Sequence, residues 1–261
     1  MPKPAVQKRE YQERVINRCL AAIEAGHKNI LIKAPTGAGK TIMGLCLAEI
    51  LHKQKGWNFG WTVMRRVLLE QAKAENDDKF GLDYGTYFST FAADLPEEGK
   101  IDLLIEDEAQ HSASDTATRL LSLVKPKVHI AFTATPFRSD RKKLCFSKVI
   151  EDAGVRQLID EGWLSPFHQY VAPIDWTPEN LASMYADDRK RWGKSVMFFL
   201  TLADCYKCKE LLLQRGVACD VVEGGSLPQQ EEKLEEFRND KLDVLLNVFV
   251  LTEGFDEPRL K

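Results

Sequence analysis

Apolar residues follow two periods along the chain. Apolar runs of strand length are found at residues 30–32, 57–64, 84–91, 101–105, 128–132, 195–200, 217–222 and 242–248. Between them, apolar residues recur at helical spacing, as Val15, Cys19 and Ile23 do within residues 9 to 25. Strands that alternate with helices predict parallel sheets, so we expect an α/β fold.

A largely polar and charged stretch from Ala172 to Lys194 separates two such series, and it contains Pro173 and Pro178. We interpret this stretch as a link, partly helical, between two domains. The predicted division is a first domain at residues 1–168, a linker at 169–194 and a second domain at 195–261.

A glycine-rich loop, Ala34 to Thr41 (A-P-T-G-A-G-K-T), lies between an apolar run and a helical stretch. It matches the phosphate-binding loop pattern, except that alanine replaces the usual first glycine. Gly37 and Gly39 let backbone N–H groups turn toward a phosphate, and the following helix N-terminus adds partial positive charge. Lys40 can reach the β- and γ-phosphates of a nucleotide, and the Thr41 hydroxyl can hold Mg²⁺. The alternative is a glycine-rich turn with a chance Lys-Thr pair, which the strand and helix context disfavours.

An acidic cluster follows the apolar run at residues 101–105. In a nucleotide-binding sheet, the carboxyl end of a strand faces the ligand. Asp107 is therefore placed to hold Mg²⁺, directly or through water, and Glu108 is placed to orient and deprotonate an attacking water. The alternative, an acidic turn between a strand and a helix, is disfavoured by the phosphate loop upstream.

Other polar residues are weaker candidates when each is taken alone. Gln12 can read an adenine edge through a paired donor and acceptor, or it can lie on an exposed helix start. Arg65 and Arg66 can meet a nucleic-acid backbone, or they can mark a solvated helix end. The Thr90 hydroxyl can contact a phosphate, although hydroxyl groups are common where strands end.

The exit of the apolar run at residues 128–132 carries two threonines, Thr133 and Thr135, before Pro136. Their hydroxyl groups can couple the nucleotide site to a second domain by hydrogen bonds. An ordinary strand exit, stopped by the proline, is the alternative. The basic run from Arg138 to Lys143 is more typical of a solvated face.

Charge and composition narrow the class of protein. The formal net charge of -3 excludes a strongly basic nucleic-acid coat, but it permits a local phosphate-binding groove. No apolar run approaches the ~20 residues of a membrane span. No apolar signal region follows Met1, so we expect a cytoplasmic protein, without a membrane partner, whose cysteines are reduced. Cys205 and Cys208 form a single C-x-x-C pair, and a zinc site needs about four ligands, so we expect no metal there.

Taken together, the motifs resemble those of a known family. In chain order they are A-P-T-G-A-G-K-T, M-R-R-V-L-L-E-Q, D-E-A-Q-H, F-T-A-T-P-F-R and L-T-E-G-F-D-E-P. This order is similar to that of superfamily 2 helicases of the DExH-box type, in the branch that includes restriction-enzyme motor subunits and phage or repair helicases. The resemblance covers nearly the whole chain. It implies two RecA-like domains, ATP with Mg²⁺ in the cleft between them, and a strand of DNA or RNA, with DNA favoured, across their top.

The resemblance also implies roles for individual residues. Lys40, Asp107 and Glu108 would carry the chemistry, with Thr41 and Asp107 on the metal and Thr133 and Thr135 linking hydrolysis to movement. The implied ATP-binding residues are Gln12, Thr36, Gly37, Ala38, Gly39, Lys40, Thr41, Gly254 and Asp256. The implied nucleic-acid-binding residues are Arg65, Arg66, Thr90 and Thr252.

Two features depart from the family pattern. Gln110 stands where His or Asp is usual, which would weaken the coupling through that motif. The chain stops at Lys261, before the family's last motif, whose arginines stabilise the transition state. Such arginines contribute roughly 10³–10⁵ in rate. We therefore expect an incomplete second sheet with an open edge, completed by a partner chain or a missing segment, and poor hydrolysis by this chain alone.

The sequence leaves three functions open. The leading one is an ATP-dependent nucleic-acid helicase or translocase. The second is a regulatory module that binds ATP and nucleic acid with little or no hydrolysis, which the absent arginines favour and the intact Asp107–Glu108 pair disfavours. The third is an unrelated phosphate-loop ATPase without a nucleic-acid partner, which M-R-R-V-L-L-E-Q and L-T-E-G-F-D-E-P disfavour.

Overall fold

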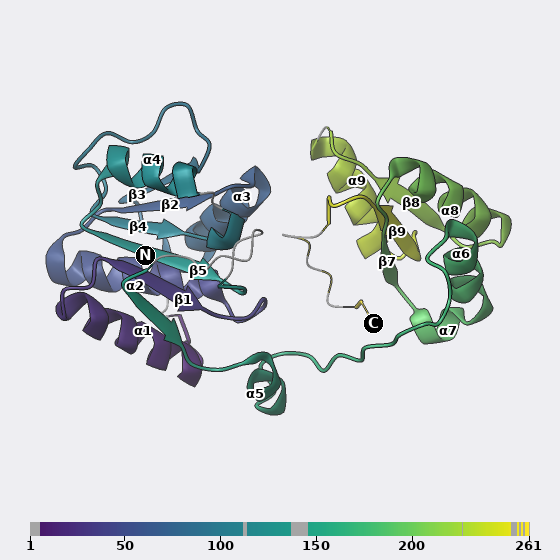
Figure 1. Cartoon of the computed structure of the whole chain (residues 1–261), viewed down its shortest axis with the longest axis horizontal. Helices are drawn as coiled ribbons and strands as arrows, with labels where there is room; N and C mark the ends of the chain where they lie inside the picture. Colours follow the sequence, from purple (N-terminus) through teal and green to yellow (C-terminus); the bar gives the residue numbers. More distant parts are fainter. Residues whose placement is uncertain are drawn as a thin grey trace. The chain divides into compact units, whose positions relative to one another are not determined.

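The fold consists of two compact units, Met1–Pro166 and Phe167–Lys261 (Figure 1). It is known from a computed structural model, which describes residues 6–111, 114–136, 146–225, 227–251, 255, 257 and 259–260. Both units are built on parallel sheets with helices against them, which confirms the predicted α/β class.

The first unit has a six-stranded parallel sheet in the order β3-β2-β4-β5-β1-β6. Its described elements are α1 (Glu10–Glu24), β1 (Asn29–Lys33), α2 (Lys40–Lys55), β2 (Phe59–Val63), α3 (Arg66–Glu75), the π-helical turn η1 (Asn76–Phe80), β3 (Gly85–Ser89), β4 (Leu103–Glu106), the 3-10 turn η2 (Ala109–His111), α4 (Ser114–Val124), β5 (Val128–Thr133), β6 (Lys148–Glu151) and α5 (Val155–Asp160).

The central strands of this sheet are buried on both faces, which is the reason that they read as continuous apolar runs. On β1, Ile30 and Ile32 belong to the main core with α1 and α2, whereas Leu31 points to the opposite face. Buried side chains of α4, such as Leu120 and Val124, cover that opposite face beside Leu104. Helices therefore cover the sheet on two sides, and both are needed to bury it.

The sequence did not predict β6. This strand pairs in parallel with β1 at the edge of the sheet, with Ile150 opposite Ile32. Only Ile150 of its four residues is buried, so the strand carries almost no apolar pattern. Pairing with β1 selects the extended conformation there.

The second unit has a three-stranded parallel sheet in the order β7-β9-β8. Its described elements are α6 (Pro178–Asp187), α7 (Arg189–Trp192), β7 (Ser195–Phe198), α8 (Leu202–Gln214), β8 (Cys219–Val222), α9 (Leu227–Arg238) and β9 (Val244–Asn247). One core joins α6 and α8 to the sheet, and a second core joins Phe237 of α9 to Val222 and Leu245.

The structure divides the chain earlier than the linker predicted at residues 169–194. That whole stretch belongs to the second unit, in which α6 packs on α8 through Leu181, Ala182 and Tyr185. Because the stretch is largely polar, these few buried positions did not indicate that it belongs to the second domain. A Thr177 side chain that accepts the Asn180 N–H, with Pro178 at the first turn, starts α6.

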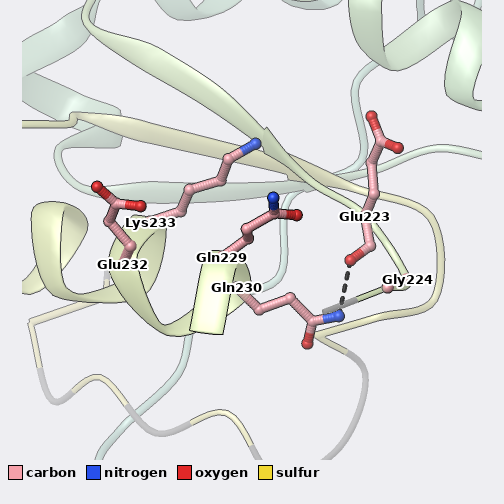
Figure 2. Close-up of a pocket in the computed structure, with 7 residues that line it drawn as sticks. Glu223, Gly224, Gln229, Gln230, Glu232 and Lys233 are labelled. Carbon is pink, nitrogen blue, oxygen red and sulfur yellow. Dashed lines mark hydrogen bonds between the residues drawn. The ribbon is translucent and has the colours of Figure 1, made fainter. Parts of the chain in front are cut away.

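A polar pocket of about 370 Å³ lies where β8 leads into α9 (Figure 2). Figure 2 shows the Gln230 amide donating to the Glu223 carbonyl, a bond of 2.8 Å. The Lys233 ammonium donates to the Val221 carbonyl at 2.6 Å. Both side chains therefore fasten α9 to the end of β8.

Candidate nucleotide site

The glycine-rich loop connects the carboxyl end of β1 to α2, as the sequence predicts. Gly37 and Gly39 have φ angles of 79° and 73°, in the left-handed region that favours glycine. The Ala34 N–H donates to the Thr133 carbonyl at 2.9 Å, which fastens the loop to neighbouring β5. Among the described residues, no side chain caps the N-terminus of α2, so its first N–H groups face the loop, as in helix-terminal phosphate sites.

Gln12 and Tyr11, both in α1, hold the loop from one side. The Tyr11 hydroxyl and the Gln12 amide donate to the Ala38 carbonyl at 2.7 and 3.0 Å, and Gln12 Oε1 accepts the Arg9 N–H at 3.0 Å. The Gln12 amide keeps one N–H and one lone pair for a further partner. A cavity of about 510 Å³ lies beside Gln12 and Gly39, large enough for a purine base.

Gly39 shows how closely these parts fit. A Cβ atom at this position would lie 2.5 Å from the Gln12 amide nitrogen. A side chain at position 39 would therefore displace Gln12 and also require an unfavourable φ. Both the backbone conformation of residue 39 and its contact with Gln12 therefore disfavour a side chain at this position.

The acidic motif lies at the carboxyl end of β4, which pairs with β5 in the centre of the sheet. The Lys40 ammonium lies 2.8 Å from Glu108 Oε1, and both side chains are largely buried. Glu108 has a φ of 52°, which is unusual for a residue with a side chain. Such strain is commonly stored at functional sites, and here it accompanies a carboxylate that meets the phosphate loop.

Gln110 connects the acidic motif to the threonine motif. Its amide donates to Glu108 Oε2 at 2.8 Å, and its Oε1 accepts the Thr133 hydroxyl at 2.5 Å. Thr133 Oγ1 also accepts the Thr135 N–H at 3.0 Å. Glutamine in place of the usual His or Asp therefore keeps the two motifs connected, because an amide donates and accepts at once.

Three motifs that are distant in sequence thus meet at one edge of the sheet. Hydrogen bonds run from Lys40 to Glu108, then to Gln110 and Thr133. Parallel strands β1, β4 and β5 are neighbours, so their carboxyl ends bring these loops together. Asp107 is next to Glu108, and its Oδ1 accepts the Glu108 N–H at 2.9 Å. The arrangement offers an ammonium, helix N–H groups and oxygen ligands to a triphosphate with Mg²⁺.

Sequence reasoning missed the turn at Trp163 and Leu164. Arg9 lies over the Trp163 ring at 5.3 Å, and Tyr11 meets the same ring edge to face at 6.4 Å. A Cβ atom on Gly37 would lie 2.9 Å from Leu164 Cδ2, so this turn forms part of the wall of the phosphate loop. No local pattern could have shown this, because Leu164 is 127 residues away in the chain.

A buried polar group below the site was also missed. His129 of β5 bonds Glu106 of β4 and Asn29 of β1, both at 2.9 Å. Histidine within an apolar run was the only available signal. The imidazole links these three neighbouring strands just beneath the acidic motif.

The residues predicted to bind nucleic acid differ in their exposure to solvent. Arg66 is exposed and pairs with Glu70 of the same helix at 3.0 Å, and Arg65 immediately precedes α3. The prediction for Thr90 needs correction, since this residue is only 2% exposed. Its hydroxyl lies 3.2 Å from the buried Thr62 hydroxyl and is not presented to a ligand.

Several sequence-based assignments lie outside the described residues. They are Thr252, Gly254, Asp256 and the basic run from Arg138 to Lys143. Cys205 and Cys208 are described and buried, and burial raises the pKa of their thiols to about 11 and about 12. Within the described part of the chain, no group of three or more His, Cys, Asp or Glu is arranged to hold a metal ion. In the same part, no helix is both long enough and apolar enough to cross a bilayer.

Comparison with known proteins supports the resemblance carried by the motifs. The family described as "Type III restriction enzyme, res subunit" matches residues 5–85. "Putative helicase 22" of Sulfolobus islandicus filamentous virus is 24% identical in an alignment 300 residues long, which covers 89% of this chain and 54% of that protein. "Putative ATP-dependent helicase IRC3" of Saccharomyces cerevisiae is 25% identical in an alignment 315 residues long, which covers 97% of this chain and 46% of that protein. The chain spans about half the length of these relatives.

Solved structures show the same fold. The "ATP-dependent Type ISP restriction-modification enzyme LlaBIII bound to DNA" gives a TM-score of 0.70 at 17% identity, covering 98% of this chain and 25% of that one. "S. cerevisiae Dbp5 bound to RNA and ADP BeF3" gives a TM-score of 0.62 at 16% identity, covering 97% of this chain and 73% of that one. Together with the sequence matches, these likenesses confirm the resemblance to superfamily 2 helicases.

Proposed function

We propose that this chain is the motor part of an ATP-dependent nucleic-acid helicase or translocase. The observation that carries the proposal is the series of hydrogen bonds from Lys40 through Glu108 and Gln110 to Thr133. It joins a phosphate-binding lysine, a candidate general base and a candidate coupling hydroxyl. A protein that only binds nucleotide has no need of the second and third of these groups.

In this proposal ATP binds at the glycine-rich loop. Thr36, Gly37, Ala38 and Gly39 supply backbone groups, and Lys40 meets the β- and γ-phosphates. Thr41 and Asp107 fit Mg²⁺, because this ion prefers oxygen ligands and takes only one or two carboxylates beside substrate phosphates. Gln12 and its neighbouring cavity receive the base, and Glu108 accepts a proton from the attacking water.

The remaining roles follow from the family that the chain resembles. ATP is hydrolysed between the two RecA-like domains, with Gly254 and Asp256 on the side of the second domain. Arg65, Arg66 and Thr252 contact the nucleic acid. DNA is the favoured strand, since LlaBIII is described as bound to DNA, although Dbp5 is described as bound to RNA. Thr133 and Thr135 couple hydrolysis to movement along that strand.

The test is ATP hydrolysis by this chain alone, with and without single-stranded and duplex DNA or RNA. We expect hydrolysis that nucleic acid stimulates and that Lys40→Ala abolishes. Lys33→Ala is a matched control, since Lys33 pairs with exposed Glu151 at the end of β1. ATP hydrolysis that is insensitive to every strand would contradict the nucleic-acid part. Tight ATP binding without turnover would favour the regulatory binding module.

A further inference from the structure

The second unit carries a cluster of two aromatic rings and one guanidinium, outside every motif discussed above. The Tyr170 and Trp192 rings meet edge to face, with centroids 6.1 Å apart. The Arg191 guanidinium lies 4.6 Å from the Tyr170 ring centroid and 4.9 Å from that of Trp192. Three planar groups are thus gathered at one place.

These groups line a cavity of about 500 Å³. Met184 and Ile174 add apolar wall, and Asn180 and Ser183 add neutral hydrogen-bonding groups. Among the described residues that line the cavity, Arg191 is the sole charged one. The volume suits a small planar group, and the charge of the wall suits an electron-rich or anionic ligand.

The cluster is exposed but held in shape. Tyr170 is 60% exposed and Trp176, further along the same segment, is 66% exposed. The Trp192 indole N–H donates to the Met184 carbonyl at 3.0 Å, which fixes one ring. The Asp188 carboxylate accepts the Arg191 N–H at 3.2 Å, which fixes the start of α7. A ligand would therefore meet a surface that is largely ordered in advance.

More cations lie near the cavity. The Arg215 guanidinium donates to Ser183 Oγ at 3.2 Å, and Arg189 donates to the carbonyl oxygens of Gly216 and Arg215. Lys190 is exposed beside Arg191. Four carboxylates are near as well: Asp187 and Asp188 lie at the end of α6, Glu179 pairs with Lys207, and Asp175 is next to Ile174 of the lining. The charge in the cavity lining itself is therefore that of the Arg191 guanidinium.

We propose that this cavity binds an unstacked base of a single-stranded nucleic acid. Tyr170 and Arg191 stack on the base, the Asn180 amide meets its edge, and Lys190 and Arg215 lie near the flanking phosphates. Stacking on aromatic and guanidinium planes is the usual way in which proteins hold single strands without strong sequence preference. The inference rests on the nucleic-acid partner of the proposed function, but it uses none of the nucleotide-site residues.

An aromatic side chain of a partner protein is the competing occupant. It would fill the apolar part of the cavity equally well, but it brings no anionic group to Arg191. The nucleic-acid strand uses both the apolar part and Arg191, since its bases are planar and its backbone is anionic. The test below separates the two occupants.

The experiment measures binding of two labelled oligonucleotides to the whole chain by fluorescence anisotropy. One carries bases and the other is abasic at every position, with equal length and charge. A third strand with 5-iodouracil is crosslinked by light, and the attachment sites are mapped by mass spectrometry. We expect preference for the base-bearing strand and crosslinks at Tyr170 or Trp192.

Variants assign the effect to the cluster. Tyr170→Leu keeps an apolar side chain without a ring, and Arg191→Lys keeps the charge without a planar group. We expect each to raise the dissociation constant of the base-bearing strand by about 5- to 100-fold and to leave the abasic strand nearly unchanged. Lys190→Gln is the control, which should weaken both strands equally and modestly, with a smaller salt dependence.

Each outcome decides the proposal. Equal binding of the base-bearing strand by Tyr170→Leu and the unaltered chain, or crosslinks confined to the first unit, would overturn the site and leave the motor proposal standing. Crosslinks at the cluster without ATP turnover would support the site while the motor proposal fails. If no strand binds and a tryptophan-bearing peptide does, the cavity is a protein-docking site and the inference is wrong.

Discussion

The Lys40 ammonium lies 2.8 Å from Glu108 Oε1, so the expected phosphate ligand and the expected general base are paired with each other. Their side chains are only 9% and 17% exposed, which limits screening by water. A triphosphate that binds Lys40 therefore meets an ammonium that is already paired with a carboxylate. The pair keeps the lysine positioned before ATP arrives.

We expect Glu108→Gln to lower ATP turnover by roughly 10²–10⁴, because the general base is lost. ATP affinity should be kept or raised, because the phosphate no longer competes with a carboxylate for Lys40. Steady-state hydrolysis and titration with a fluorescent ATP analogue measure the two effects. Glu98→Gln, at an exposed pair with Lys125, is the control. Weaker binding of the analogue by Glu108→Gln would contradict this account.

The second prediction concerns the connection between the acidic and threonine motifs. The Thr133 side chain bonds Gln110, whereas Thr135 takes part through its backbone N–H and carbonyl groups. We therefore expect Thr133→Val and Gln110→Ala to reduce nucleic-acid stimulation of hydrolysis more than Thr135→Val does. ATP affinity should change little in all three. Equal loss in Thr135→Val would show that its hydroxyl has a separate role.

A third prediction tests the wall of the phosphate loop. Leu164 packs against the main core and approaches Gly37. Leu164→Ala should destabilise the first unit by about 1–3 kcal/mol. This value lies at the lower end of the range for buried leucines or below it, because Leu164 is only half-buried. The substitution should also weaken ATP binding severalfold, since the loop loses a neighbour. Thermal unfolding with and without an ATP analogue measures both.

Leu213→Ala is the matched control for this change, because Leu213 of α8 is 50% exposed. Gly37→Ala provides a second test, since it combines an unfavourable φ with a contact to Leu164. The double variant with Leu164→Ala should recover the part of the loss that comes from the contact. Strict additivity of the two changes would exclude coupling between these residues.

The fourth prediction is a pH dependence in the second unit. Burial raises the pKa of Asp220, but the Lys209 hydrogen bond, the Val221 N–H and the Lys233 charge lower it more, so the net pKa is below its usual value. The folded state thus binds this proton more weakly than the unfolded state. The carboxylate stabilises the fold above its unfolded pKa of about 4 and loses this contribution as the pH falls through the lower folded value.

We expect Asp220→Asn to reduce the stability around β8 at pH 7 and to flatten its fall below about pH 4. Hydrogen exchange of the amides of residues 219–222 measures this locally. Asp187→Asn, at the exposed end of α6, is the control. An unchanged acid dependence in Asp220→Asn would rule out this carboxylate as its source.

The fifth prediction concerns the thiols. Burial raises the pKa of Cys219 to about 11, and it also raises the pKa values of its neighbours Cys205 and Cys208. Because the thiolate is the reactive form, we expect these three to react with a disulfide reagent at pH 8 far more slowly in the native chain than in urea. The assay uses a Cys145→Ser background, which removes a thiol outside the described residues. Fast native labelling of Cys205 would show that α8 opens readily.

The sequence by itself determined the series of strands and helices, the phosphate loop and the acidic motif. These features are local: the period of the apolar residues and the chemistry of a short loop are properties of neighbours in the chain. β6 was not predicted, because an edge strand with one buried residue shows too little of this apolar period. The helix α6 was assigned to a linker because its buried residues lie in a largely polar stretch.

Only the tertiary structure decided which groups meet. Thr90 is buried because β2 and β3 pair, Gln110 bridges two motifs because β4 and β5 are neighbours, and Leu164 reaches Gly37 across the chain. The cluster at Arg191 forms because the segment with Tyr170 folds back on α7. Contacts between distant residues depend on how the elements pack, and the pattern of a short stretch of sequence does not determine that packing.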